Sequence, residues 1–209
     1  MSEVARLRAV LAERRDRLGD AHADTLAAML DLAEALWDEG RLAEARPLEE
    51  AVVAGRRALF GDGHPDTLKA IGKLATTIGQ YGDLAGARRL QEEVLAGMRA
   101  LHGADGRDAL RAANNLAGTL AALGEGEAAG ALLDATIAAL VARFGEDDGD
   151  TLAALGNRAA FLWQVGEVEE AFALQERVCT ALSRTRGAAD IATRRAAAVL
   201  DGMLRAALS

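Results

Sequence analysis

The sequence predicts an all-α solenoid built from stacked pairs of antiparallel helices, and three observations lead to this fold class. An octet returns every 42 residues, starting at residues 19, 61, 103 and 145, and reads GDAHADTL, GDGHPDTL, GADGRDAL and GEDDGDTL. Between the octets, apolar residues such as Leu68, Ile71 and Leu74 follow the spacing of one helix face. The sequence has no alternating pattern of apolar and polar residues that would indicate a strand.

The 42-residue period fixes the order of the predicted elements. Six residue series keep the period at once, among them those that begin at Gly19, Asp24, Gly40 and Ala45. Each repeat is therefore predicted to consist of a helix A, a glycine turn, a helix B and a second glycine turn. About ten helices are expected in a single domain over 1–209: an unpaired helix B in 1–18, repeats in 19–60, 61–102, 103–144 and 145–186, and a closing helix A in 187–209.

The octet itself combines a helix stop with a helix start. Gly61 is predicted to end a helix in the left-handed conformation that glycine adopts readily. Pro65 suits the first position of the next helix, where no N–H is needed, and Asp66 places a negative charge near the positive end of the helix dipole. Leu68 begins the buried stripe. The octet thus recurs because the helix pair recurs.

The composition is that of an ordered, helix-rich protein with an acidic surface. Hydrophobic residues make up 51% of the 209 residues and charged residues 27%. The net charge of −8 repels phosphate backbones and aromatic residues are only 3%, so we expect no nucleic-acid partner. No signal segment or span of about 18 apolar residues is present, and the single cysteine, Cys179, cannot form an internal disulfide, which favours a cytoplasmic protein without a membrane partner. The excess of arginine over lysine suggests GC-rich coding and a bacterial source.

The repeat resembles the 42-residue tetratricopeptide repeat (TPR) of the kinesin light chain type. The family pattern L-G-x-x-H-P-D-T-L corresponds to Leu59–Leu68, with Phe60 interrupting it. The later family positions N-L-A, G and E-A-x-x-L correspond to 115–117, Gly166 and 170–174. The third repeat departs from the pattern with Gly-Arg in place of His-Pro, and the fourth with Asp-Gly. The resemblance implies a right-handed superhelical solenoid whose A helices line a concave groove.

The titratable residues of the octets suggest catalysis or metal binding as an alternative. His22 and His64 occupy equivalent positions, but the remaining histidine, His102, lies at a different offset, so no metal site is expected. The octet aspartates are spread along the array and do not face one bond as a catalytic pair does. Motifs of nucleotide-binding proteins, serine hydrolases and zinc proteases are absent, and Cys179 lies on the predicted core stripe. We therefore expect no enzymatic activity and no cofactor.

The resemblance also implies that the groove is lined by positions 69, 72, 73, 76, 79 and 80 and by those at multiples of 42 residues from them. All asparagines and lysines of the chain fall at these positions, and both tryptophans share one of them. Each of these residues could instead serve helix packing or solvation. The expected groove residues are Trp37, Lys69, Lys73, Gln80, Arg111, Asn114, Asn115, Asn157, Trp163 and Gln164.

These groove residues predict a non-catalytic scaffold that binds a peptide or protein segment. Asparagine amides can pair with the N–H and C=O groups of an extended backbone, and tryptophan is a common interface anchor. Positive charge at Lys69, Lys73 and Arg111 suggests an acidic group on the partner, whereas the first repeat is acidic at Asp31, Glu34 and Asp38. The alternative is a self-associating structural or regulatory segment of a larger signalling or adaptor protein, since an unpaired helix at either end could form a homo-oligomer.

Overall fold

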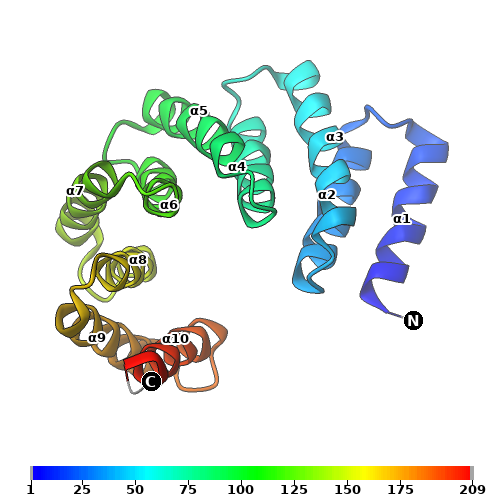
Figure 1. The fold of residues 1–209 in the computed structure, drawn as a ribbon. Coiled ribbons are helices and arrows are strands. Elements are labelled where there is room, and N and C mark those ends of the chain that lie inside the picture. The colour runs from blue at the N-terminus through cyan, green and yellow to red at the C-terminus, as the bar shows by residue number, and fades with distance from the viewer. Residues whose placement is uncertain (1, 208–209) are drawn as a thin grey trace. The chain divides into compact units, whose positions relative to one another are not determined.

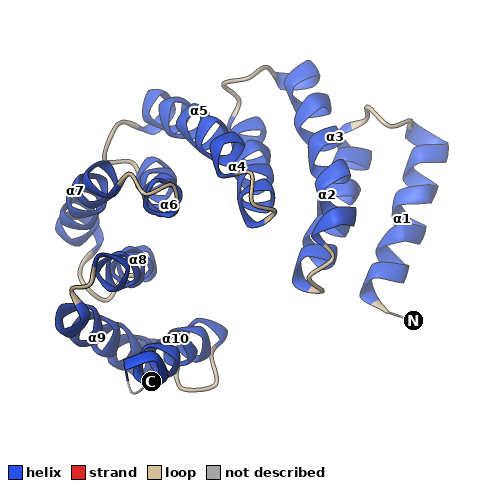
Figure 2. Ribbon diagram, in the orientation of Figure 1, coloured by secondary structure: helices blue, strands red, loops and turns tan. Residues whose placement is uncertain are grey.

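The computed structural model of the protein describes residues 2–207, which fold into ten α-helices without a β-strand (Figure 2). Residues 1, 208 and 209 of the predicted terminal helices lie outside this described part. The all-α fold predicted from the sequence is therefore confirmed. Among residues 2–207, no helix combines the length and the apolar character needed to cross a lipid bilayer.

The chain divides into two compact units, Met1–Gly103 and Ala104–Ser209, here called unit 1 and unit 2. Within each unit the helices follow one another in chain order (Figure 1). This division does not decide whether the chain is one domain over 1–209, so that expectation stays a prediction. Unit 1 contains α1 (Glu3–Leu18), α2 (Ala23–Asp38), α3 (Leu42–Phe60), α4 (Pro65–Gln80) and α5 (Leu84–His102), and unit 2 contains α6 (Arg107–Ala122), α7 (Gly126–Phe144), α8 (Gly149–Val165), α9 (Val168–Arg186) and α10 (Ile191–Ala207).

Helices of one unit pack against their neighbours in sequence, as helix pairs require. In unit 1, each helix from α1 to α4 contacts the next one, and in unit 2 the same holds from α6 to α9, with a further contact between α6 and α8. Small residues bring the paired helices close together, because helix separation depends on the side chains at the contact. The alanines near the start of helix B are fully buried in all four repeats, at Ala45, Ala87, Ala129 and Ala171.

The octets mark the starts of the A helices, as predicted. His22 and His64 are the N-cap residues of α2 and α4, and the Nδ1 atom of each accepts a hydrogen bond from the backbone N–H two residues later at 3.2 Å. Asp148 caps α8 in the same way at 3.0 Å, whereas Gly106, at the start of α6, has no side chain to offer. Each cap satisfies an N–H group that the first helical turn leaves without a partner.

Glycines end the helices, in two different backbone conformations. Gly166, after α8, has φ 89° and ψ 5°, which is the left-handed helical conformation. Gly61, after α3, has φ 87° but ψ 167°, an extended region that is almost exclusive to glycine. The prediction of a left-handed helical residue at Gly61 is therefore wrong in ψ, although its positive φ still requires glycine.

Candidate functional site

In unit 1, two of the predicted groove residues, Trp37 and Lys73, lie at one pocket. This unit 1 pocket has a volume of about 330 Å³ and is formed by α2, α3 and α4. Lys69 and Gln80 are exposed on α4 and are not part of its lining. The lining residues are Glu34, Trp37, Asp38, Glu49, Lys73, Thr76 and Thr77.

The charge of Lys73 is compensated within unit 1. Its ammonium group donates a hydrogen bond to the carboxylate of Glu34 on α2, and both side chains stay partly exposed. Such an exposed ion pair contributes little stability, because water screens it. The pairing with Glu34 nevertheless reduces the positive electrostatic potential that Lys73 presents to an incoming ligand. Lys69 has no hydrogen-bond or ion-pair partner within residues 2–207.

Glu49 is the pocket residue that the sequence analysis missed. It comes from α3, is only 4% exposed, and its Oε2 atom has no hydrogen-bond partner in the described chain. The hydroxyl of Thr77 lies close enough to this carboxyl to lower its pKa, although no hydrogen bond of standard geometry joins the two. Burial raises the pKa of the Glu49 carboxyl, and the nearby Thr77 hydroxyl and Lys73 ammonium oppose this only in part. A sequence signal did exist, since the equivalent positions of the other repeats are not acidic and hold Gln91, Leu133 and Gln175.

In unit 2, the predicted residues Arg111, Asn114 and Asn115 line a second pocket, the unit 2 pocket, with a volume of about 260 Å³. Asn157 donates a hydrogen bond from its Nδ2 atom to the Oδ1 atom of Asn114 at 3.0 Å, and Asn114 is only 8% exposed. These two amides therefore bind each other, while Asn115 stays exposed to solvent. The remaining lining residues are Leu140, Asp150 and Ala153.

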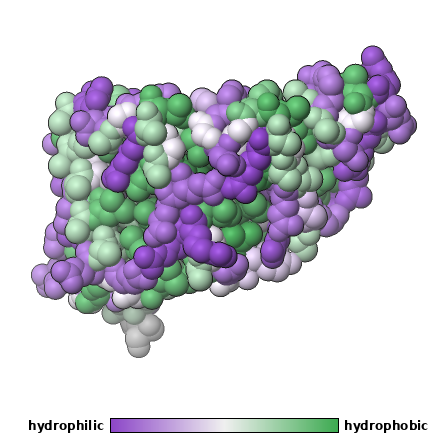
Figure 3. Space-filling model, turned by 90° about the horizontal axis from the view of Figure 1, so that it is seen from above, coloured by the Kyte–Doolittle hydropathy of each residue, from purple (hydrophilic) through white to green (hydrophobic). Residues whose placement is uncertain are grey.

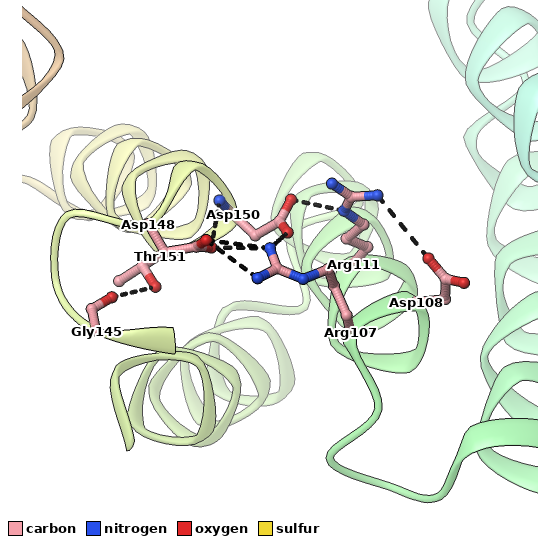
Figure 4. A network of polar contacts seen from close by, with 7 residues as sticks. All are labelled: Arg107, Asp108, Arg111, Gly145, Asp148, Asp150 and Thr151. Atoms are coloured by element: carbon pink, nitrogen blue, oxygen red, sulfur yellow. Dashed lines mark hydrogen bonds and ion pairs between the residues drawn. The ribbon is translucent and has the colours of Figure 1, made fainter. Parts of the chain in front are cut away.

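Arg111 takes part in an ion-pair network at the start of α8 (Figure 4). Its Nε atom donates to Oδ1 of Asp150 at 2.6 Å. Arg107, one turn earlier on α6, also contacts Asp150, and both of its terminal nitrogens donate to Asp148 at 3.1 Å. The Arg107 guanidinium lies 3.9 Å from the centroid of the Phe144 ring, which adds a cation–π contact. The network joins α6, α7 and α8.

The network shifts the ionisation of Asp148 and Arg107 toward their charged forms. Burial of the Asp148 carboxyl disfavours its charge, but hydrogen bonds from Arg107 and from the backbone of Asp150 outweigh burial, so the Asp148 pKa lies below its ordinary value. Hydrogen bonds to Asp148 and Asp150 raise the Arg107 pKa in turn. The positive charge that the sequence analysis assigned to Arg111 is thus largely balanced by carboxylates of α8. Arg107 and Asp148 were not among the predicted residues.

The two tryptophans share a repeat position but have different surroundings. Trp37 lines the unit 1 pocket. The ring of Trp163 lies edge-on to the ring of Phe172 on α9, with 5.6 Å between the centroids, so packing accounts for this residue. Gln164, the next residue, is exposed on α8.

The residues proposed above as non-functional also have structural explanations. Within residues 2–207, no group of three or more His, Cys, Asp or Glu side chains is arranged to hold a metal ion. Cys179 packs against the buried cluster of Leu152, Val178 and Leu182. Burial raises the pKa of its thiol above the ordinary value of 9.0, which disfavours the nucleophilic thiolate.

A comparison with family models finds the tetratricopeptide repeat at residues 25–66, 67–108 and 151–190, which is more than half of the chain. The chain belongs to the tetratricopeptide repeat family. The matched segments leave out residues 109–150, which hold most of α6 and all of α7. The resemblance seen in the sequence is thereby confirmed.

Solved structures of other proteins have a similar fold. A protein of Podosopora anserina, described as a kinesin light chain with nearly identical TPR-like repeats, is 27% identical to this TPR chain, with a TM-score of 0.73 over 88% of this chain and 86% of that one. A second structure with that description gives a TM-score of 0.70 at the same identity, over 88% and 87% of the two chains. BtubC (BKLC) from P. vanneervenii is 17% identical, with a TM-score of 0.72 over 98% and 83%, a likeness of fold alone. The search of curated proteins gives no match.

Proposed function

We propose that this TPR protein is a non-catalytic scaffold that binds a peptide or protein segment along the A helices of its units. The observation that carries the proposal is that each unit has a pocket lined by predicted groove residues, Trp37 and Lys73 in unit 1 and Arg111, Asn114 and Asn115 in unit 2. TPR proteins generally serve as protein–protein interaction scaffolds, and such surfaces combine apolar area with polar recognition groups. Apolar and hydrophilic side chains are interleaved on the face in view in Figure 3.

In unit 2, Asn115 is the residue best placed to recognise a peptide backbone. Its amide is exposed on α6 at the edge of the unit 2 pocket, and it can donate to a peptide carbonyl and accept from a peptide N–H. Asn114 and Asn157 support the surface by binding each other. A rigid helical surface has little conformational freedom to lose on binding, which favours affinity.

The proposed preference for an acidic group on the partner now depends mainly on Lys69. Lys73 and Arg111 are paired with Glu34 and Asp150, so their charges are already balanced. Lys69 is exposed on α4 and has no partner within residues 2–207. An acidic ligand group at this position would bind more weakly as salt rises, because solvent-exposed attraction is screened.

The test is a selection of peptides from a random displayed library on the immobilised full chain. Peptides that bind the wild type are titrated against Asn115→Ala, which should weaken binding about tenfold, because a buried backbone group of the peptide loses its partner. The matched control is Ser183→Ala, which removes an exposed polar side chain from α9, a helix B. If Ser183→Ala weakens binding and Asn115→Ala does not, the partner uses the B helices and the proposal is wrong.

Self-association is a second candidate function, favoured by the apolar side chains that α10 exposes. Ile191, Val199 and Leu204 are 59%, 45% and 46% exposed. Burial of such side chains against a second copy would be favourable, since apolar surface would leave water. Light scattering over a concentration series tests this candidate. A constant monomer mass at all concentrations would exclude it.

A further inference from the structure

We propose that the unit 1 pocket binds the cationic side chain of a lysine or arginine that the bound peptide presents. This inference rests on the proposed function and names the chemistry that one part of the surface recognises. It differs from the sequence-based expectation, which placed only an acidic partner group near this region. Four observations support it: the burial of Glu49, the charge balance of the pocket lining, the presence of Trp37 in this lining, and the residues that the other repeats have at the position of Glu49.

The first observation is that the buried Glu49 carboxyl has one oxygen without a hydrogen-bond partner in the described chain. Only 4% of the residue is exposed, and its Oε2 atom accepts no hydrogen bond from residues 2–207. A buried polar atom without a partner costs stability, and such atoms in native proteins call for an explanation. The Thr77 hydroxyl, at the same pocket, favours the ionised carboxyl less than burial disfavours it. The Glu49 carboxyl therefore keeps acceptor capacity that a donor-rich group would satisfy.

The second observation is the charge balance of the lining. Three carboxyl groups line the pocket, Glu34 and Asp38 from α2 and Glu49 from α3. The single basic lining residue, Lys73, is already bound to Glu34. The electrostatic complement of this lining is a cation, because an opposite charge close to a carboxylate lowers its energy. A bound ammonium or guanidinium would also favour the ionised form of Glu49, which burial disfavours.

The third observation separates an organic cation from a metal ion. Trp37 lines the pocket, and the face of an indole ring attracts ammonium and guanidinium groups. Within residues 2–207, no three acidic, imidazole or thiol groups are arranged to hold a metal ion. At about 330 Å³, the pocket is at the lower end of the range of about 300–1,000 Å³ that is usual for ligand sites, so it suits one side chain better than a large ligand.

The fourth observation is that the other repeats lack this combination. At the position of Glu49 they have Gln91, Leu133 and Gln175. The Nε2 atom of Gln175 donates to the backbone carbonyl of Ala196 at 2.8 Å, so a glutamine here can find its partner on the following A helix. A carboxylate has no hydrogen to donate and cannot make that bond. Glutamic acid at residue 49 thus lacks the donor of Gln175 and adds a carboxyl group to the pocket, whereas a buried oxygen without a partner is shared with Gln91 and Gln175.

The experiment uses displayed peptides selected on the immobilised full chain, and the same peptides measured against Glu49→Gln. Glutamine has the same shape and is present at the equivalent position of two other repeats, so this variant should fold, which circular dichroism checks. Glu50→Gln is the matched control: it makes the same charge change on the same helix, at an exposed residue that pairs with Arg46. We expect selected peptides to share a lysine or arginine and to bind Glu49→Gln about tenfold more weakly, with little change for Glu50→Gln.

Synthetic versions of the selected peptides identify the group that enters the pocket. Replacement of the shared basic residue by the other basic residue should preserve most binding, whereas acetylation of a lysine or replacement by leucine should cost as much as Glu49→Gln. In a double-mutant cycle, the peptide change and Glu49→Gln should be strongly non-additive.

The outcomes separate this inference from the proposed function. Peptides that bind the wild type but share no basic residue, or that bind Glu49→Gln as tightly as the wild type, would overturn the inference and leave the scaffold function standing. A library that yields no binding peptide would overturn the proposed function, and the inference with it.

Discussion

The least exposed carboxylates of the two units differ in whether all of their oxygen atoms have partners within the chain. In unit 2, Asp148 and Asp150 are held by Arg107 and Arg111, so that each of these four charges has a partner within the unit. In unit 1, the still more buried Glu49 has an oxygen atom without a partner in the described chain. The two sites belong to the same repeating framework, so the difference lies in a few side chains. A carboxylate that is paired internally stabilises its unit, whereas a buried carboxyl oxygen without a partner costs stability.

If both units share the same glycine turns, the same glycine substitution should destabilise each of them. This is the largest effect that we expect. Gly82 and Gly166 occupy equivalent turns with φ of 96° and 89°. Replacing either by valine should destabilise the protein by about 1–3 kcal/mol, because a β-branched residue is strained at positive φ. The strain comes from the backbone alone, since a Cβ at either site would meet no atom within 4 Å.

Chemical denaturation of each glycine variant measures the change. Gly63→Val is the control, because Gly63 also has open space around it but no positive φ. Equal stability of Gly82→Val and Gly63→Val would show that the turn after α4 does not require the positive φ of Gly82.

The second prediction concerns the paired carboxylate of unit 2. Asp148→Ala removes the N-cap of α8 and the partner of Arg107, and loss of the cap alone should cost about 0.5–2 kcal/mol at neutral pH. The folded-state pKa of Asp148 is lowered, so its stabilisation is present above the ordinary value of 3.8 and is lost as pH falls through the folded-state pKa. The stability difference between wild type and variant should therefore shrink in acid.

Denaturant titrations from pH 7 down to about pH 3 follow this difference. Helix α6 of the same unit provides the comparison, because it begins at Gly106 and has no side-chain cap whose hydrogen bond could be lost in acid. A difference that stays constant over this pH range would mean that the Asp148 charge is not part of the network.

The third and smallest effect has the opposite sign, and it concerns Glu49. Its folded-state pKa is raised, so its contribution to stability is fully present below the ordinary value of 4.5 and is lost as pH rises through the folded-state pKa. Glu49→Gln should therefore stabilise the protein at pH 7, by about 1 kcal/mol as is usual for a point substitution, and the gain should fade toward pH 4. Thermal unfolding at both pH values measures it. A loss of stability at pH 7 would indicate that Glu49 has a partner in solution.

The repeat period predicted the fold well, because it acts on every copy at once. Gly61, Pro65 and Asp66 mark one helix end and one helix start, and the same positions do so in the other repeats. The resemblance to tetratricopeptide repeats implied groove positions on the A helices, and two of these, Trp37 and Lys73, line the unit 1 pocket. The fold therefore follows from local residue chemistry repeated along the chain, whereas the binding site stays a prediction.

The details of the site could not be predicted, because they depend on side chains of neighbouring helices. The ion pair of Lys73 with Glu34 joins residues that are not at equivalent repeat positions, so no residue series points to it. Asn114 and Asn115 are adjacent in sequence, yet one is buried and the other exposed. Glu49 was missed because only A helices were considered, whereas this residue reaches the pocket from a helix B.

The imidazole caps of unit 1 fix the tautomer of two histidine rings. Because Nδ1 of His22 and of His64 accepts a hydrogen bond, the neutral ring must carry its hydrogen on Nε2. The ring of His64 is also stacked on Phe60, with centroids 4.7 Å apart, which holds its orientation. Nitrogen-15 resonances distinguish the two ring nitrogens, so His22 and His64 become internal probes of the starts of α2 and α4. His102, outside the octets, provides the reference ring in the same spectrum.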